Sequence, residues 1–140
     1  MIVDIVLFLH LLGLMMGAGG GFGSMIVMRG ALKMMPEQAG PVRSLGPALG
    51  RFSSIGLVLM VVTGVTLVFI KYGGLQGLPQ LFWVKMIFVS SLTLAAFTLE
   101  WTYLSVKRGD LEAAKRLPAL GPWAGLSSLL AVLFAVLAFH

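Results

Sequence analysis

Four long apolar segments, separated by short polar connections, most constrain what this chain can fold into. The first runs from Ile5 to Met28, and the others cover residues 53–70, 81–99 and 119–139. Each approaches the roughly 20 residues that a helix needs to cross about 30 Å of hydrocarbon. The mean hydropathy of +1.01 and the charged fraction of 11% are unlike those of a soluble domain. The sequence therefore predicts an integral membrane protein.

The short connections predict one all-α domain over residues 1–140, an integral membrane antiparallel four-helix bundle. We expect spans at about 4–28, 53–70, 81–101 and 119–139. Proline is predicted to end helices in the connections, because it lacks a backbone donor. The expected breaks are Pro36, Gly40-Pro41 and Gly46-Pro47 before the second span, and Pro118 before the fourth, where Gly121-Pro122 follows it. The charged stretch from Lys107 to Leu117 is predicted to be helical.

The distribution of basic residues predicts the topology. The second connection holds only Lys71, whereas the first holds Arg29, Lys33, Arg43 and Arg51 and the third holds Lys107, Arg108, Lys115 and Arg116. By the positive-inside rule both termini face outward. The basic residues are not interleaved with exposed aromatics, so no nucleic-acid partner is expected despite the net charge of +5. Membrane lipids and a second copy of the chain are the expected neighbours, in a bacterial inner membrane.

His10 is the only ionisable side chain in the run from Ile5 to Met28. Ionisable groups inside a membrane are costly, and a functional site is the default hypothesis for them. The chain has no cysteine, which excludes disulfides, thiolate metal sites and iron–sulfur clusters. Any redox function therefore needs a bound cofactor, and His10 is the candidate metal ligand.

Gly13, Gly17 and Gly21 form a double G-x-x-x-G pattern on the helix that carries His10. One interpretation is close helix packing, which glycine permits in membranes. The other is that the missing side chains leave room for a flat ligand below His10. The residues alone leave both open.

Two further cations belong to the spans. Lys85 lies about one turn inside the third span, at a depth similar to that of His10. It either snorkels to the interface beside Trp83 or holds an acidic ligand group. Arg51 opens the second span and is expected to pair with Glu100 at the inner end of the third. An alternative role for Arg51 is to hold a ligand carboxylate or a lipid phosphate.

Three short motifs resemble, in order, those of the four-helix membrane proteins related to HemJ-type protoporphyrinogen IX oxidase and the copper-resistance CopD domain. They are LFLHLLG at residues 7–13, Arg51-Phe52 with the later Gly64, and WVKM at residues 83–86. The resemblance implies that His10 is an axial ligand of haem b, and that Arg51 and Lys85 belong to the porphyrin site. HemJ-type proteins carry a tryptophan where this chain has Gly17, and a second histidine at about Ala96.

We therefore expect a membrane protein that binds haem b and has a redox role. Protoporphyrinogen oxidation is one candidate reaction. We expect Gly13 and Gly17 to make room for the ring and a porphyrin or redox partner to bind beside them. Two other classes stay open. A CopD-like copper transport or resistance protein would use His10 with some of the nine methionines, since thioethers favour Cu(I). A non-catalytic membrane subunit would use the glycines only to dock a partner.

Overall fold

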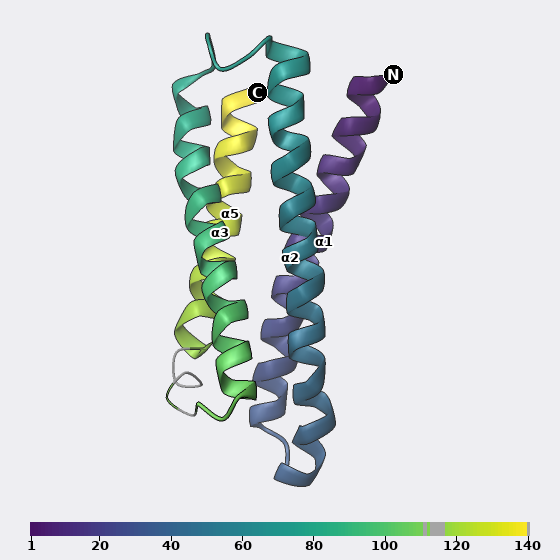
Figure 1. Cartoon of the computed structure of the whole chain (residues 1–140), viewed down its shortest axis with the longest axis vertical. Coiled ribbons are helices and arrows are strands. Elements are labelled where there is room, and N and C mark those ends of the chain that lie inside the picture. The colour runs from purple at the N-terminus through teal and green to yellow at the C-terminus, as the bar shows by residue number, and fades with distance from the viewer. Residues whose placement is uncertain (111, 113–116, 140) are drawn as a thin grey trace.

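The computed structural model describes residues 1–110, 112 and 117–139, and four long helices make up almost all of this part (Figure 1). They are α1 (Ile2–Leu32), α2 (Pro36–Tyr72), α3 (Gln80–Lys107) and α5 (Leu117–Phe139). The described part of the chain holds no strand, as the sequence predicts. Of the charged stretch 107–117, predicted to be helical, Lys107 ends α3 and residues 108–110 are not helical, while residues 111 and 113–116 lie outside the described residues.

Three of the helices have the length and composition of membrane spans. These are α1, α2 and the part of α3 from Gln80 to Thr102. Within α5, the described stretch Gly125–Leu137 is apolar but shorter. In Figure 1 the N-terminus, the α2–α3 connection and the end of α5 lie at the upper end, while the α1–α2 connection lies at the lower end.

The second helix is longer than the sequence predicts, and the expected breaks at Gly40-Pro41 and Gly46-Pro47 are wrong. α2 begins at Pro36 and continues through both later prolines to Tyr72. Each internal proline removes one helical donor, which frees the carbonyls of Glu37 and Arg43. Both of these residues are exposed, so water can bind the freed carbonyls. Pro118 lies in the first turn of α5, which begins at Leu117 and continues through Gly121-Pro122. The helix break between α1 and Pro36 is confirmed.

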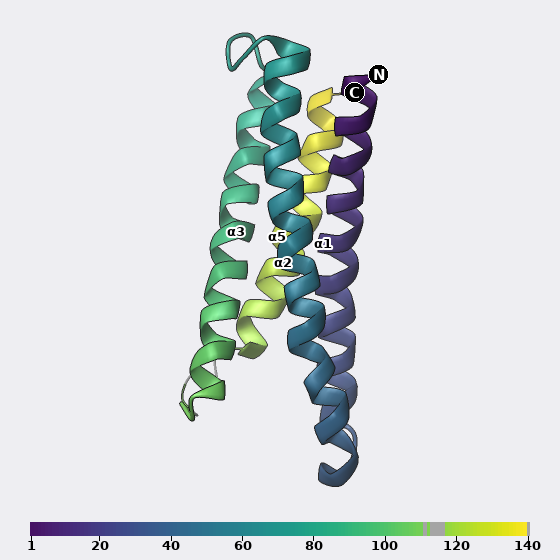
Figure 2. The same cartoon turned by 45° about the vertical axis from the view of Figure 1, so that its right-hand side comes forward.

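The four helices form two pairs. α1 packs along most of α2, here termed the first pair, and α3 packs along α5, the second pair. Contacts between the pairs are few, both from α1 to α5 and from α2 to α3. Figure 2 shows that the pairs diverge toward the lower end. A cavity between the pairs, lined by residues of all four helices, forms the candidate site.

Small residues bring α1 and α2 into backbone contact. A Cβ atom built on Gly13 would lie 2.8 Å from the Gly56 carbonyl oxygen, and one on Gly20 would lie 2.8 Å from the Leu49 carbonyl oxygen. The Ser53 hydroxyl donates to the Gly17 carbonyl at 2.6 Å. Close approach of this kind is what G-x-x-x-G patterns provide between apolar helices.

The second pair is joined by aromatic side chains. Phe88 and Phe134 stack with ring centroids 5.3 Å apart and an interplanar angle of 6°. The Trp123 indole donates to the Ser91 hydroxyl at 3.1 Å. Together these contacts fix α5 against α3 at two levels.

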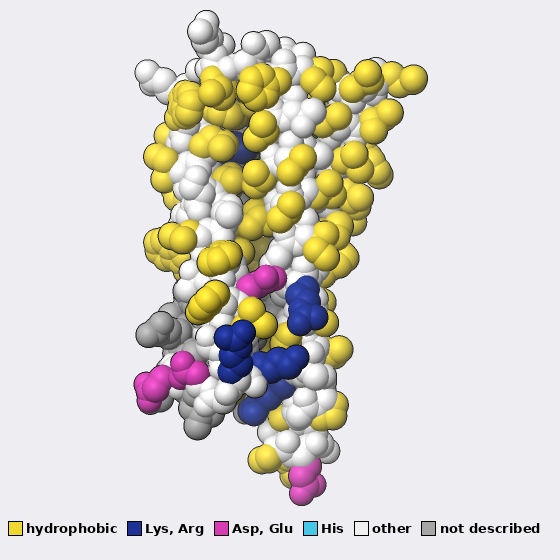
Figure 3. Space-filling model, viewed as in Figure 1, with side chains coloured by type: hydrophobic (Ala, Val, Ile, Leu, Met, Phe, Trp, Pro, Cys, Tyr) yellow, Lys and Arg dark blue, Asp and Glu magenta, His cyan; other side chains and the backbone are white. Residues whose placement is uncertain are grey.

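The surface of the molecule is strongly apolar. Large side chains such as Ile26, Ile87 and Phe97 are 67–68% exposed. In the face shown in Figure 3, hydrophobic side chains cover the upper and middle parts, and charged side chains gather toward the lower end. Water alone is a poor environment for such a continuous apolar surface.

Candidate functional site

His10 is held by a hydrogen bond between the two helices of the first pair. Its Nδ1 atom lies 3.0 Å from the Thr63 hydroxyl oxygen on α2. That hydroxyl donates its own proton to the Leu59 carbonyl at 2.6 Å. Because the hydroxyl proton is used, the imidazole Nδ1 acts as the donor, and Nε2 keeps its lone pair. This is the tautomer that a metal-binding imidazole presents when its other nitrogen donates a hydrogen bond.

Gly64 provides the space that the imidazole occupies. A Cβ atom at this position would lie 3.0 Å from the Cε1 atom of His10 and 3.5 Å from its Nδ1 atom. Contact at 3.0 Å is too close for two carbon atoms, so any larger residue would displace the ring. In the sequence Gly64 is only part of a motif, and its contact with His10 could be found only from the packing of α1 on α2.

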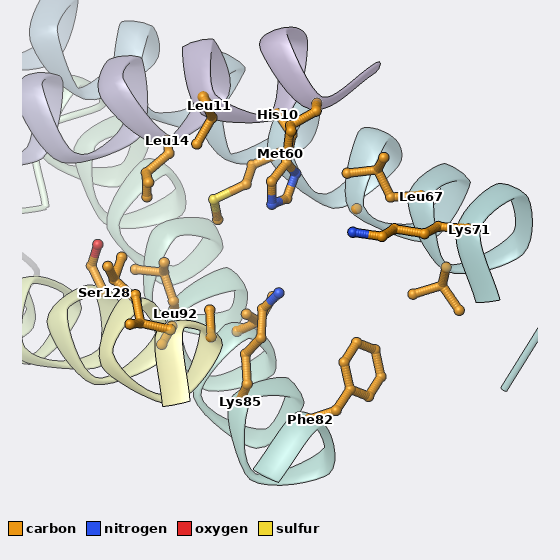
Figure 4. A pocket seen from close by; sticks show the side chains of 18 of the residues that line it. His10, Leu11, Leu14, Met60, Leu67, Lys71, Phe82, Lys85, Leu92 and Ser128 are labelled. Carbon is orange, nitrogen blue, oxygen red and sulfur yellow. The ribbon is translucent and has the colours of Figure 1, made fainter. Parts of the chain in front are cut away.

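A cavity of about 320 Å³ lies between the two helix pairs, with a wall from each of the four helices. Figure 4 shows His10 from α1, Met60 from α2, Lys85 and Leu92 from α3, and Ser128 from α5 around it. A second cavity of about 150 Å³ shares His10 and Lys85 with the first and lies between α2 and α3. Cavities of about 300 Å³ and more are typical of small-molecule sites.

Lys85 turns into this cavity. Figure 4 shows its ammonium group pointing from α3 into the space below the His10 ring. The Lys85 Nζ atom lies 5.7 Å from the Phe82 ring centroid, and the side chain is half-buried. The structure therefore places His10 and Lys85 at one cavity.

Lys71 is a cavity residue that sequence reasoning missed. It lies near the end of α2 and lines the larger cavity, and Figure 4 shows its ammonium group directed inward. In the sequence Lys71 serves only to predict the topology. Its spacing contains a usable signal, because Gly64, Leu67 and Lys71 follow the i, i+3, i+7 pattern of one helix face.

The cavity is cationic and largely apolar. Among the described residues that line the two cavities there is no Asp or Glu. The remaining walls are mostly aliphatic or aromatic, as at Leu14, Phe82 and Leu92. In the described part of the chain, no three His, Cys, Asp or Glu side chains gather as a metal-binding group. The arrangement suits a ligand with an apolar body and negative groups, and with a metal that accepts one imidazole.

Gly13 and Gly17 lie away from the cavity, at the contact between α1 and α2. Gly13 is buried against the α2 backbone, and the Gly17 carbonyl accepts the Ser53 hydrogen bond. Neither residue lines either cavity. Helix packing therefore accounts for both glycines.

Arg51 lies far from His10 and Lys85. It precedes Thr63, the partner of His10, by 12 residues on α2, which is about 18 Å at 1.5 Å per residue, and it lines neither cavity. The expected Arg51–Glu100 ion pair is wrong: both side chains are exposed, and the described ion pairs do not include one between them. The physical reason is the divergence of α2 from α3 toward the lower end (Figure 2).

Comparison of the chain with protein-family models, with curated proteins and with solved structures finds no match. The resemblance to HemJ-type and CopD proteins therefore stands on the three motifs alone. Of the polar residues in those motifs, the structure brings His10 and Lys85 together.

Proposed function

We propose that the chain is an integral membrane protein, an antiparallel four-helix bundle with both termini on the outer side of a bacterial inner membrane. The apolar surface and the three span-length helices support this proposal. The concentration of charged side chains toward the lower end of the face in Figure 3 fits an inner end rich in Lys and Arg.

We further propose that the cavity binds haem b, with His10 as the axial ligand, and that the protein has a redox role. The observation that carries this proposal is the imidazole fixed by Thr63, whose Nε2 lone pair is available beside a cavity that also receives the Lys85 ammonium. The residues fit the group: Gly64 leaves room for the ring of His10, and the walls are apolar. When bound, haem supplies one-electron exchange.

The residues around the cavity have distinct roles in this proposal. Thr63 holds the imidazole in one orientation and one tautomer. Lys85 offers a positive charge to a propionate of the ligand. The apolar side chains from α3 and α5 exclude water from the ligand face. Gly13, Gly17 and Arg51 bind no part of the ligand. All of these residues come from one chain, so the expected homo-oligomer is not needed to complete the site.

Copper binding is a second candidate, favoured by the methionines Met60 and Met86 that share the smaller cavity with His10. Thioether and imidazole ligands suit Cu(I). However, Lys85 lines the same cavity and Lys71 lines the larger one, and these positive charges disfavour a bare cation. A ligand that carries its own negative groups is the better fit.

The test is an absorption spectrum of the purified protein, oxidised and dithionite-reduced, after expression with adequate haem supply. We expect a Soret band that shifts on reduction, at about one haem per chain, and its loss in His10→Ala. His140→Ala, which removes the other histidine of the chain, is the matched control and should leave the band unchanged. A colourless wild-type protein, or a full Soret band in His10→Ala, would overturn the proposal. Metal analysis of the same sample tests copper.

A further inference from the structure

We propose that Lys71 and Lys85 form a two-point subsite for carboxylates, so that the cavity selects an apolar molecule with two carboxylates at one edge. This inference deepens the proposed function, because it concerns the same cavity, but it does not require iron or a bond to His10. Lys71 has no role in the proposed haem ligation, and its place in the cavity is the observation that the inference adds.

The two ammonium groups reach the cavity from different helices. Lys71 lies on the last turn of α2, and Lys85 lies on the second turn of α3, just after the connection between them. Figure 4 shows the two side chains entering from different sides. Two separate point charges suit two separate anionic groups, whereas a single phosphate would have to draw both side chains to one point.

The charge balance of the cavity supports an anionic ligand. The described lining residues provide two ammonium groups and one imidazole, with no carboxylate. Positive side chains at the wall of a largely apolar cavity favour an anionic ligand over a cationic one. A dicarboxylate is a ligand of that kind.

The polarity of the walls gives the ligand an orientation. Lys71 and Lys85 lie toward the upper end, where α2 ends and α3 begins. Leu14 and Leu92 line the deeper part of the cavity (Figure 4). The carboxylates are therefore held near the upper end, with the apolar body directed toward the middle of the helices, and His10 lies beside that body.

The experiment uses metal-free protoporphyrin IX, whose two propionates are present but which offers no iron to His10. Its free acid, monomethyl ester and dimethyl ester are titrated into the full-length protein in detergent. Binding is measured as quenching of Trp83, which lines the smaller cavity. The Trp83→Phe variant is titrated in parallel and supplies the signal from the other tryptophans and from porphyrin in micelles.

We expect the free acid to bind more tightly than the dimethyl ester, with the monoester between them. Lys71→Met should weaken free-acid binding by about 2- to 5-fold, the range for a largely exposed charge pair, and Lys85→Met should weaken it more. Neither variant should change dimethyl ester binding. Because each lysine binds one carboxylate, Lys71→Met should lower the ratio of the affinity for the free acid to the affinity for the monoester. Lys33→Met, at the lower end, is the control and should match wild type; unfolding temperatures verify folding.

Equal binding of the free acid and the dimethyl ester would overturn the inference, and so would wild-type affinity in Lys71→Met. Phosphatidylglycerol and neutral phosphatidylcholine are compared at the same lipid-to-protein ratio. If only phosphatidylglycerol displaces the free acid, the two lysines form a phosphate subsite instead. If haem fails to bind while the free-acid preference holds, only the proposed haem function fails. If haem binds through His10 while acid and esters bind alike, only this inference fails.

Discussion

The His10 imidazole on α1 and the Thr63 hydroxyl on α2 share a hydrogen bond of 3.0 Å, and Thr63 in turn donates to the Leu59 carbonyl. The backbone of α2 thereby sets the orientation of a ring that belongs to α1. Thr63 is a positioning residue in the proposed haem site, since it acts on the ligand only through His10.

Thr63→Val removes this hydrogen bond while it keeps the shape of the side chain. We expect haem affinity to fall by about 10- to 100-fold, the usual cost of losing a partner of a metal-bound histidine. Thr66→Val is the control, because the Thr66 hydroxyl bonds only within its own helix, to the Val62 carbonyl. Haem titration followed at the Soret band measures both variants. Equal affinities in the two would remove Thr63 from the site.

Gly64→Ala is expected to perturb the haem spectrum without unfolding the protein. Its methyl carbon would lie 3.0 Å from the His10 Cε1 atom, so the ring must rotate or shift. Gly50→Ala on the same helix meets nothing within 4 Å and should leave the spectrum unchanged. The measurement is the position and intensity of the Soret band. Identical spectra in the two alanine variants would contradict the packing of Gly64 on His10.

Gly56→Ala is expected to destabilise the first helix pair. The added methyl carbon would lie 2.5 Å from the Gly17 backbone nitrogen and 2.7 Å from the Gly13 carbonyl oxygen. Overpacking of this kind costs about 1–3 kcal/mol. Gly19→Ala on α1 has open space around it and serves as the control. Thermal unfolding in detergent should show a lower Tm only for Gly56→Ala, and equal values would argue against close α1–α2 packing.

The proposed topology is directly testable, because the chain has no cysteine of its own. Single variants Gln76→Cys, in the α2–α3 connection, and Met35→Cys, in the α1–α2 connection, place one thiol at each end of the molecule. A membrane-impermeant maleimide applied to spheroplasts should label Gln76→Cys at once and Met35→Cys only after lysis. The opposite pattern would invert the proposed orientation.

Hydropathy and length were sufficient to predict the all-helical fold and the approximate positions of the helices. The helix ends were less predictable: Pro41 and Pro47 lie inside α2, because exposed carbonyls tolerate a lost donor where water is available. The α2 end is better marked, since Gly73 adopts a φ of 69° there, which glycine accepts without strain.

The site was predictable only in part. His10 and Lys85 meet because both face the space between the helix pairs, as their similar depth suggests. The roles of Gly64, Thr63 and Lys71 depend on how α2 is rotated about its axis, which one apolar sequence does not reveal. The Arg51–Glu100 pair failed for a related reason, since similar depth does not ensure contact between diverging helices.

Because the two helix pairs have few contacts with each other, a ligand in the cavity between them would affect how the pairs pack together. The cavity walls come from both pairs, so a bound molecule would contact both and add interactions between pairs that otherwise have few contacts with each other. Ligand occupancy and the angle between the pairs would then be linked thermodynamically, with each favouring the other. An apoprotein built in this way is expected to open and close as two rigid halves, with the ligand setting the closed state.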